Sequence, residues 1–126
     1  MATIPAVRQT DVPHEGPCIL WLWETLTATN NVGARVPVGH RPGKSFHAVG
    51  TFGGAVTVRG SNLKDPDVTN PLHWFALRDP TKTVISLTAN GGEECLECVL
   101  WVSPAAGAGV ADVDVWMLAV SAHTRS

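Results

Sequence analysis

The sequence predicts an all-β domain, a jelly roll or antiparallel β-sandwich, over residues 18–126. Apolar stretches of strand length recur at roughly ten-residue spacing and are separated by turn-forming segments, which is typical of this class. No stretch of helical length places its apolar residues on one helix face. The 126 residues include 12 glycines and 9 prolines, which favour short strands and turns over a helical bundle. A chain of this length can bury the core of one domain.

The chain begins with a segment that has no strand pattern. Residues 1–17 hold Pro5, Pro13 and Pro17 without a periodic apolar pattern, so they are predicted to form an extended arm. The segment also lacks the basic start and continuous apolar stretch of a signal peptide. Three cysteines, an odd number, argue against a secreted disulfide framework. We therefore expect synthesis in a reducing cytoplasm.

The predicted strands follow in order after the arm. Residues 18–29 form the first, and a loop with Asn30–Asn31 and Arg41–Pro42–Gly43 separates it from the next pair. Later strands are expected at residues 73–77, 84–89, 96–102 and 112–121, with Gly-, Pro-, Asn- or Asp-rich turns between them.

The stretch SFHAVGTFGGAVTVRGSN, residues 45–62, gives the clearest local signal. Two alternating runs flank Gly53–Gly54, which predicts a β-hairpin with a two-residue turn. Glycine supplies the positive φ that such a turn needs. In that register Val49, Thr51, Val56 and Val58 share the core face.

Three predicted strands, residues 18–29, 96–102 and 112–121, are apolar on both faces. A strand of a two-layer sandwich needs only one apolar face. The surplus tryptophans are Trp21, Trp23, Trp101 and Trp116. Outward aromatic residues of a small domain mark a protein interface. Alternatively, loops fold over these faces and bury the tryptophans within one protomer.

The composition excludes two classes of partner. A formal net charge of −2 leaves no positive excess to neutralise phosphates, so we expect no nucleic acid partner. No apolar run approaches the roughly 18 residues that span a bilayer, so we expect no membrane partner.

Candidate catalytic and metal motifs are incomplete. Cys95-Leu-Glu-Cys98 has the spacing of a zinc or redox motif, but no second pair and no helix start accompany it. The five histidines share no spacing with a nucleophile, and the Asp-x-Asp pairs lack the spacing of a calcium loop. We therefore expect no enzyme activity, no metal and no cofactor.

Trp74 and Phe75 are adjacent in HWFAL and offer a platform for stacking a sugar ring. This pair supports an alternative function, a carbohydrate-binding jelly-roll module of a phage head or tail fibre. The other interpretation is that one ring packs in the core and the other at its edge.

Four segments carry a family resemblance: VGTFGGAVTVRGSN, WFALRDPTKTVISLTANG, WVSPAAGAG and DVDVWMLAV. They resemble the capsid cement (decoration) proteins of tailed phages, that of a Bordetella phage head among them. The resemblance implies a jelly roll on the outer surface of an HK97-type shell, bound to the major capsid protein and often paired with itself. SPAAGAGVAD and CLECVLW depart from the family, which has a longer glycine-rich stretch and a more polar run there.

These observations together predict a virion structural protein on the capsid outer surface. We expect Trp21, Trp23 and Trp101 to be apolar anchors on the partner. Arg8 and the rest of the arm are expected to lie along a capsid subunit by strand addition. The expected partners are the major capsid protein and further copies of this chain, as a dimer or trimer on the capsid.

Overall fold

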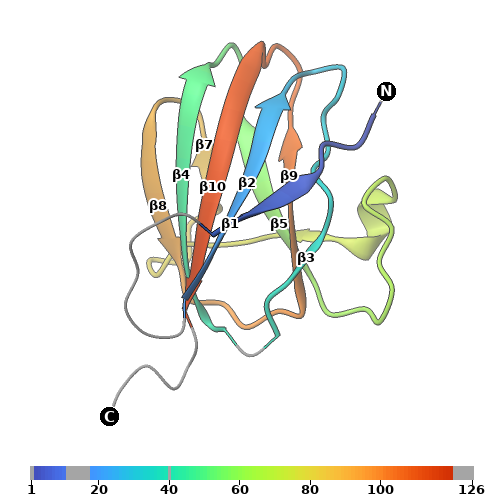
Figure 1. Ribbon diagram of the computed structural model, residues 1–126, viewed down its shortest axis with the longest axis vertical. Helices are drawn as coiled ribbons and strands as arrows, with labels where there is room; N and C mark the ends of the chain where they lie inside the picture. The colour runs from blue at the N-terminus through green and yellow to red at the C-terminus, as the bar shows by residue number, and fades with distance from the viewer. Residues whose placement is uncertain (1, 11–17, 40, 121–126) are drawn as a thin grey trace.

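The computed structural model describes residues 2–10, 18–39 and 41–120. They form two antiparallel β-sheets packed face to face, which confirms the predicted sandwich (Figure 1). A single turn of 3₁₀-helix, η1 (Pro71–His73), accompanies the strands in this part of the chain. Within the same residues, no helix has the length and apolar character needed to cross a bilayer.

Sheet I has five strands in the order β1-β2-β10-β4-β8 and faces the viewer in Figure 1. Their bounds are β1 (Ala6–Gln9), β2 (Cys18–Leu26), β10 (Asp112–Val120), β4 (Gly43–Thr51) and β8 (Gly91–Cys95). All neighbouring strands of this sheet are antiparallel.

Sheet II lies behind sheet I, in the order β3-β9-β5-β6, with β7 also paired to β5. Its strands are β3 (Val36–Pro37), β9 (Trp101–Ala106), β5 (Val56–Ser61), β6 (Phe75–Ala76) and β7 (Ser86–Leu87). Short edge strands of this kind leave few open hydrogen-bonding groups for aggregation.

The core lies between the sheets and consists of the inward side chains of the central strands. Period-2 alternation sends every second side chain of β10, β4 and β5 inward. The inward residues include Val113, Val115, Met117, Phe46, Ala48, Val56 and Val58. Trp23 of β2 is also completely buried, and its indole Nε1 donates a 2.9 Å hydrogen bond to the carbonyl oxygen of Ala34.

The predicted hairpin at Gly53–Gly54 is wrong. β4 pairs with β10 and β8 in sheet I, whereas β5 pairs with β9, β6 and β7 in sheet II. The chain therefore crosses between the sheets at the two glycines. A Cβ on Gly54 would lie 2.1 Å from the Ala108 carbonyl oxygen, so close backbone approach, and not positive φ, requires glycine here.

The crossing also changes which side chains enter the core. Val56 and Val58 are buried as predicted, but Val49 is 40 % exposed and points away from sheet II. Phe46 and Ala48 occupy the core face of β4 instead, because β4 takes its register from β10 and not from β5.

The described part of the predicted arm belongs to the domain. Residues 6–9 are extended, as expected, but they form β1 and pair with β2 of the same chain. The backbone of Ile4 also bonds to Val32 and Ala34. Residues 11–17 of the predicted arm lie outside the described residues.

Candidate docking face

Sheet I presents an apolar outer face that no described segment covers. Strand register aligns Val7, Leu22 and Trp116 in one row and Leu20 with Leu118 in the next. Of these, Val7 and Leu118 are 45 % and 38 % exposed, Leu20 and Trp116 are partly buried, and Leu22 is buried between its neighbours. We name the open face as the outward residues Val7, Leu20, Leu22, Ser45, His47, Val49, Trp116 and Leu118.

The open face contains a shallow hollow of about 450 Å³. The side chains around it come from β2, β10 and β4: Leu20, Trp116, Leu118, Ser45, His47 and Val49. The His47 and Trp116 rings lie 6.3 Å apart at an angle of 50° and form one wall. A volume of this size admits inserted side chains or a small ligand.

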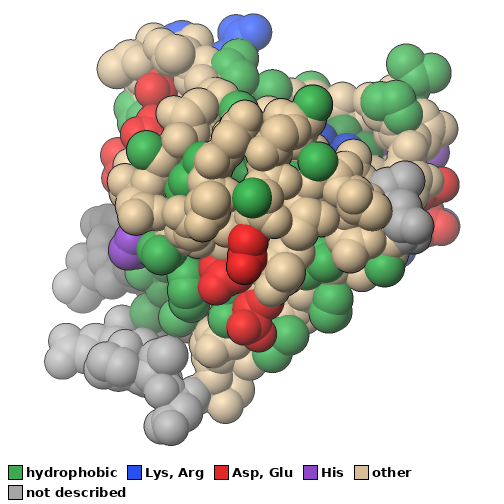
Figure 2. Space-filling view, turned by 90° about the horizontal axis from the view of Figure 1, so that it is seen from above, with side chains coloured by type: hydrophobic (Ala, Val, Ile, Leu, Met, Phe, Trp, Pro, Cys, Tyr) green, Lys and Arg blue, Asp and Glu red, His purple; other side chains and the backbone are tan. Residues whose placement is uncertain are grey.

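Carboxylates lie around the open face. Three of them lie at the end of the sheet where β10 begins: Asp112, Asp114 and Glu24. A fourth, Glu94 of β8, lies opposite Ser45 of β4. Figure 2 shows this end of the sandwich, with acidic side chains grouped in the middle of the view and hydrophobic side chains next to them. Asp114 Oδ1 accepts a 2.9 Å hydrogen bond from the Thr25 amide, which holds the bulge of β2 at this position.

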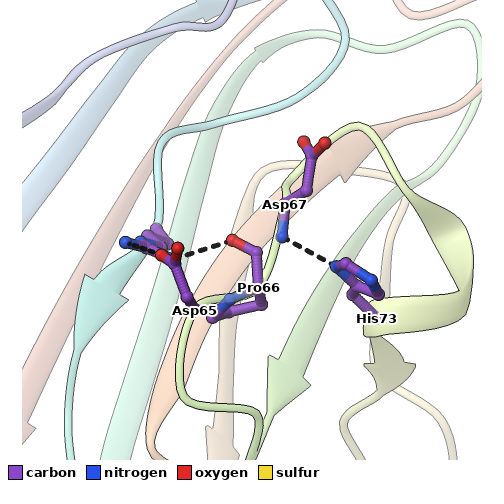
Figure 3. Close-up of polar contacts among 5 residues, drawn as sticks. Asp65, Pro66, Asp67 and His73 are labelled. Atoms are coloured by element: carbon purple, nitrogen blue, oxygen red, sulfur yellow. Dashed lines mark hydrogen bonds and ion pairs between the residues drawn. The ribbon is translucent and has the colours of Figure 1, made fainter.

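The outer face of sheet II is covered, in contrast, by residues 62–74. The Arg35 guanidinium lies 4.4 Å from the Trp101 ring centre, pairs with Asp65 at 2.6 Å and donates to the Pro66 carbonyl oxygen at 2.8 Å. Figure 3 shows the contacts with Asp65 and Pro66 and the 2.9 Å hydrogen bond from the Asp67 amide to His73 Nδ1. The loop is therefore tied to the sheet at several points.

Arg59 also connects this loop to sheet II. Its guanidinium lies 4.9 Å from the Trp74 ring centre and donates to Ser103 Oγ at 2.7 Å and to the Val68 carbonyl oxygen at 3.2 Å. Burial lowers the pKa of Arg59 to about 10, still far above neutral pH, so the side chain stays charged.

These contacts remove the predicted sugar platform. Trp74 is only 9 % exposed, its ring faces Arg59, and its Nε1 donates a 2.8 Å hydrogen bond to the Asp67 carbonyl oxygen. Phe75 remains 44 % exposed, but the adjacent Trp74 ring is buried and does not extend its surface. Little of the Trp74 ring is therefore accessible for stacking against a sugar ring.

We expect Arg59→Met to lower the free energy of unfolding by about 1–3 kcal/mol, because methionine keeps the apolar stem but leaves the Ser103 and Val68 acceptors without their donor. Urea unfolding measures the loss, and limited proteolysis should detect faster cleavage within residues 62–74. The exposed Arg78→Met is the control and should change stability by less than about 0.5 kcal/mol. Equal stability of the two variants would contradict the assigned role of Arg59.

The structure places the residues predicted as partner contacts in different surroundings. Trp23 has no exposed surface, so its prediction as an anchor is wrong; its ring fills the core. Trp21 is half-buried and packs against that core, and Trp101 lies under Arg35 on sheet II. Arg8 is exposed on the edge strand β1. Contacts of Arg8, Trp21 and Trp101 with a partner stay predictions.

The open face uses the residues that alternate with the predicted anchors. Leu20 and Leu22 flank Trp21 in sequence and point to the opposite side of β2. The sequence signal for them was the second apolar face of the same strand, together with Trp116 and Leu118 on β10.

The two cysteines of the Cys95–Cys98 motif have different surroundings. Cys95 is buried and Cys98 is exposed. Burial raises the pKa of the Cys95 thiol, which disfavours the nucleophilic thiolate at neutral pH. Lys44 lies opposite Cys95 in the register; burial lowers its pKa, and its Nζ donates to the Pro42 and Glu97 carbonyl oxygens. Among the described residues, no three His, Cys, Asp or Glu side chains cluster so as to hold a metal ion.

Comparison with known proteins supports the fold. The sequence matches no protein-family model and no curated protein. A cupin domain from Bordetella pertussis Tohama I is similar in structure, with a TM-score of 0.52 and 10 % identity over 97 % of this chain and 99 % of that one. The SPBc2 prophage-derived protein YomS is also similar, with a TM-score of 0.55 and 14 % identity over 87 % of this chain and 100 % of that one. At these identities the likeness shows the shared β-sandwich fold.

Proposed function

We propose that this chain is a structural protein of a phage virion, a capsid cement (decoration) protein that docks through the open face. Its partner in this proposal is the major capsid protein of an HK97-fold shell, on the outer surface of the virion. The observation that carries the proposal is the exposed apolar face of sheet I, with its hollow between β2, β10 and β4. An exposed apolar patch on a small domain usually serves an interface.

Two further observations support the proposal. Four segments of the sequence resemble cement proteins of tailed phages, and the fold is similar to that of a prophage-derived protein. The mechanism needs no catalytic residue, nucleic acid contact or membrane contact. A protein that binds the assembled shell, and not its dispersed subunits, stabilises the shell by mass action. Many copies on one lattice add their small contributions.

The proposal is tested by co-sedimentation of the purified chain with expanded, empty shells of the phage that encodes it. Leu118→Asp places a charge in the open face and should weaken binding at least about thirtyfold, or about 2 kcal/mol. Leu118 is 38 % exposed, so the substitution should leave the fold intact, which circular dichroism and thermal unfolding can verify.

Leu72→Asp is the matched control, because Leu72 is 91 % exposed on η1 in the loop that covers sheet II. This variant should bind like the wild type. Failure of the wild-type chain to bind the shells would contradict the proposed function. Equal binding by Leu118→Asp and the wild type would contradict docking through the open face.

A further inference from the structure

The outward positions of sheet I carry charge of one sign. Glu24, Glu94 and Asp112 are exposed, and Asp114 is partly buried beside Thr25. Asp112 and Asp114 lie opposite Thr51 and Val49 of β4, and Glu94 lies opposite Ser45. The four carboxylates therefore flank the open face at one end and along one side. We name them the acidic rim.

The described strands of sheet I place no lysine or arginine on the open face. Lys44 of β4 points inward and is 2 % exposed, and Arg8 of β1 is aligned with Trp21, whose side chain points to the core side. Arg35 pairs with Asp65 on the sheet II side, away from these carboxylates. Within the described strands of sheet I, therefore, no lysine or arginine side chain lies beside the acidic rim.

We propose that the open face binds a surface of another protein that projects an apolar side chain flanked by arginine or lysine. The hollow receives the apolar side chain, and the acidic rim pairs with the basic residues around it. Complementary charge of this kind steers encounter and fixes the orientation of docking. The inference rests on the proposed function and adds the chemistry of the docking site on the capsid protein.

A second copy of the chain does not fit the same site. A two-fold pairing of identical faces is self-complementary, so each residue meets the symmetric set on its partner. Two copies of the open face would bring acidic rims into one interface, and like charges oppose such an approach. In this proposal, contacts between neighbouring copies on a shell use other surfaces of the protein.

Charge-neutral variants test the inference on the same expanded shells. Glu24→Gln with Asp112→Asn removes two carboxylates of the acidic rim without changing size. The control, Glu93→Gln, removes an exposed carboxylate outside it and should bind like the wild type. The rim variant should bind about tenfold more slowly in dilute salt, because steering is lost. Raising the salt concentration should slow wild-type binding and shrink its difference from the rim variant.

The outcomes separate this inference from the proposed function. Shells that bind no wild-type chain overturn both. Shells that bind wild type and rim variant at equal rates, or the rim variant faster, overturn the basic partner surface alone. Sedimentation velocity of the free chain adds a second readout: a dimer that the rim variant strengthens would make a second copy the occupant and overturn the inference.

Discussion

Trp23→Ala is expected to lower the free energy of unfolding by about 3–5 kcal/mol, the usual cost of truncating a buried aromatic side chain. The indole ring is completely enclosed, so its removal leaves a cavity between the sheets. The variant also leaves the Ala34 carbonyl oxygen without the 2.9 Å hydrogen bond from Nε1. Urea unfolding followed by tryptophan fluorescence and circular dichroism measures the loss.

Trp116→Ala is the control for this measurement. Trp116 lies on the open face, so its truncation should cost only about 1 kcal/mol of stability while weakening binding to shells. Similar losses of stability in the two variants would contradict the assignment of Trp23 to the core and Trp116 to the surface.

The sequence showed that β2 is apolar on both faces, but the prediction that Trp23 faces outward chose the wrong face. An alternating pattern has period 2, so a shift of one residue exchanges core and surface. In β2 both choices place large apolar side chains inward. The choice depends on pairing with β10, which aligns Trp23 with the buried Val115, and on the Ala34 carbonyl oxygen within reach of the indole. Val115 and Ala34 are both distant from Trp23 in the sequence, so the local apolar pattern of β2 does not include them.

For a similar reason, the sequence does not determine which of the two sheets has its outer face covered. Trp101 and Trp116 both lie on strands with a surplus apolar face, so the pattern treats them alike. Contacts from distant residues distinguish them: Arg35 lies over Trp101 and also binds Asp65 and Pro66. The sequence therefore predicted the existence of an exposed apolar face, whereas its position on sheet I depends on long-range contacts of the loop.

The turn at Gly53–Gly54 shows where local signals are ambiguous. A glycine pair between two alternating runs is typical of a tight hairpin, because glycine tolerates positive φ. The same pair also suits a site where two backbones meet closely. Here the second property applies: a Cβ on Gly53 would lie 2.4 Å from the Gly109 carbonyl oxygen, and the glycine-rich stretch of residues 107–109 is the other half of the contact.

Gly54→Ala is therefore expected to lower the free energy of unfolding by about 2–4 kcal/mol. The new methyl carbon would lie 2.1 Å from the Ala108 carbonyl oxygen and 3.1 Å from its carbonyl carbon, so backbone must move. A hairpin turn with its glycines exposed to solvent would lose less, because no backbone would oppose the methyl group. Thermal and urea unfolding measure the difference.

Gly43→Ala provides the matched glycine control, since its Cβ would meet no atom closer than Val120 Cβ at 3.9 Å. Alanine there reduces the freedom of the unfolded chain and should leave stability unchanged or raise it by about 0.5 kcal/mol. If Gly54→Ala proved as stable as Gly43→Ala, the close crossing between the sheets would be contradicted. That crossing sends β4 into sheet I beside β10, where Ser45, His47 and Val49 complete the hollow of the open face.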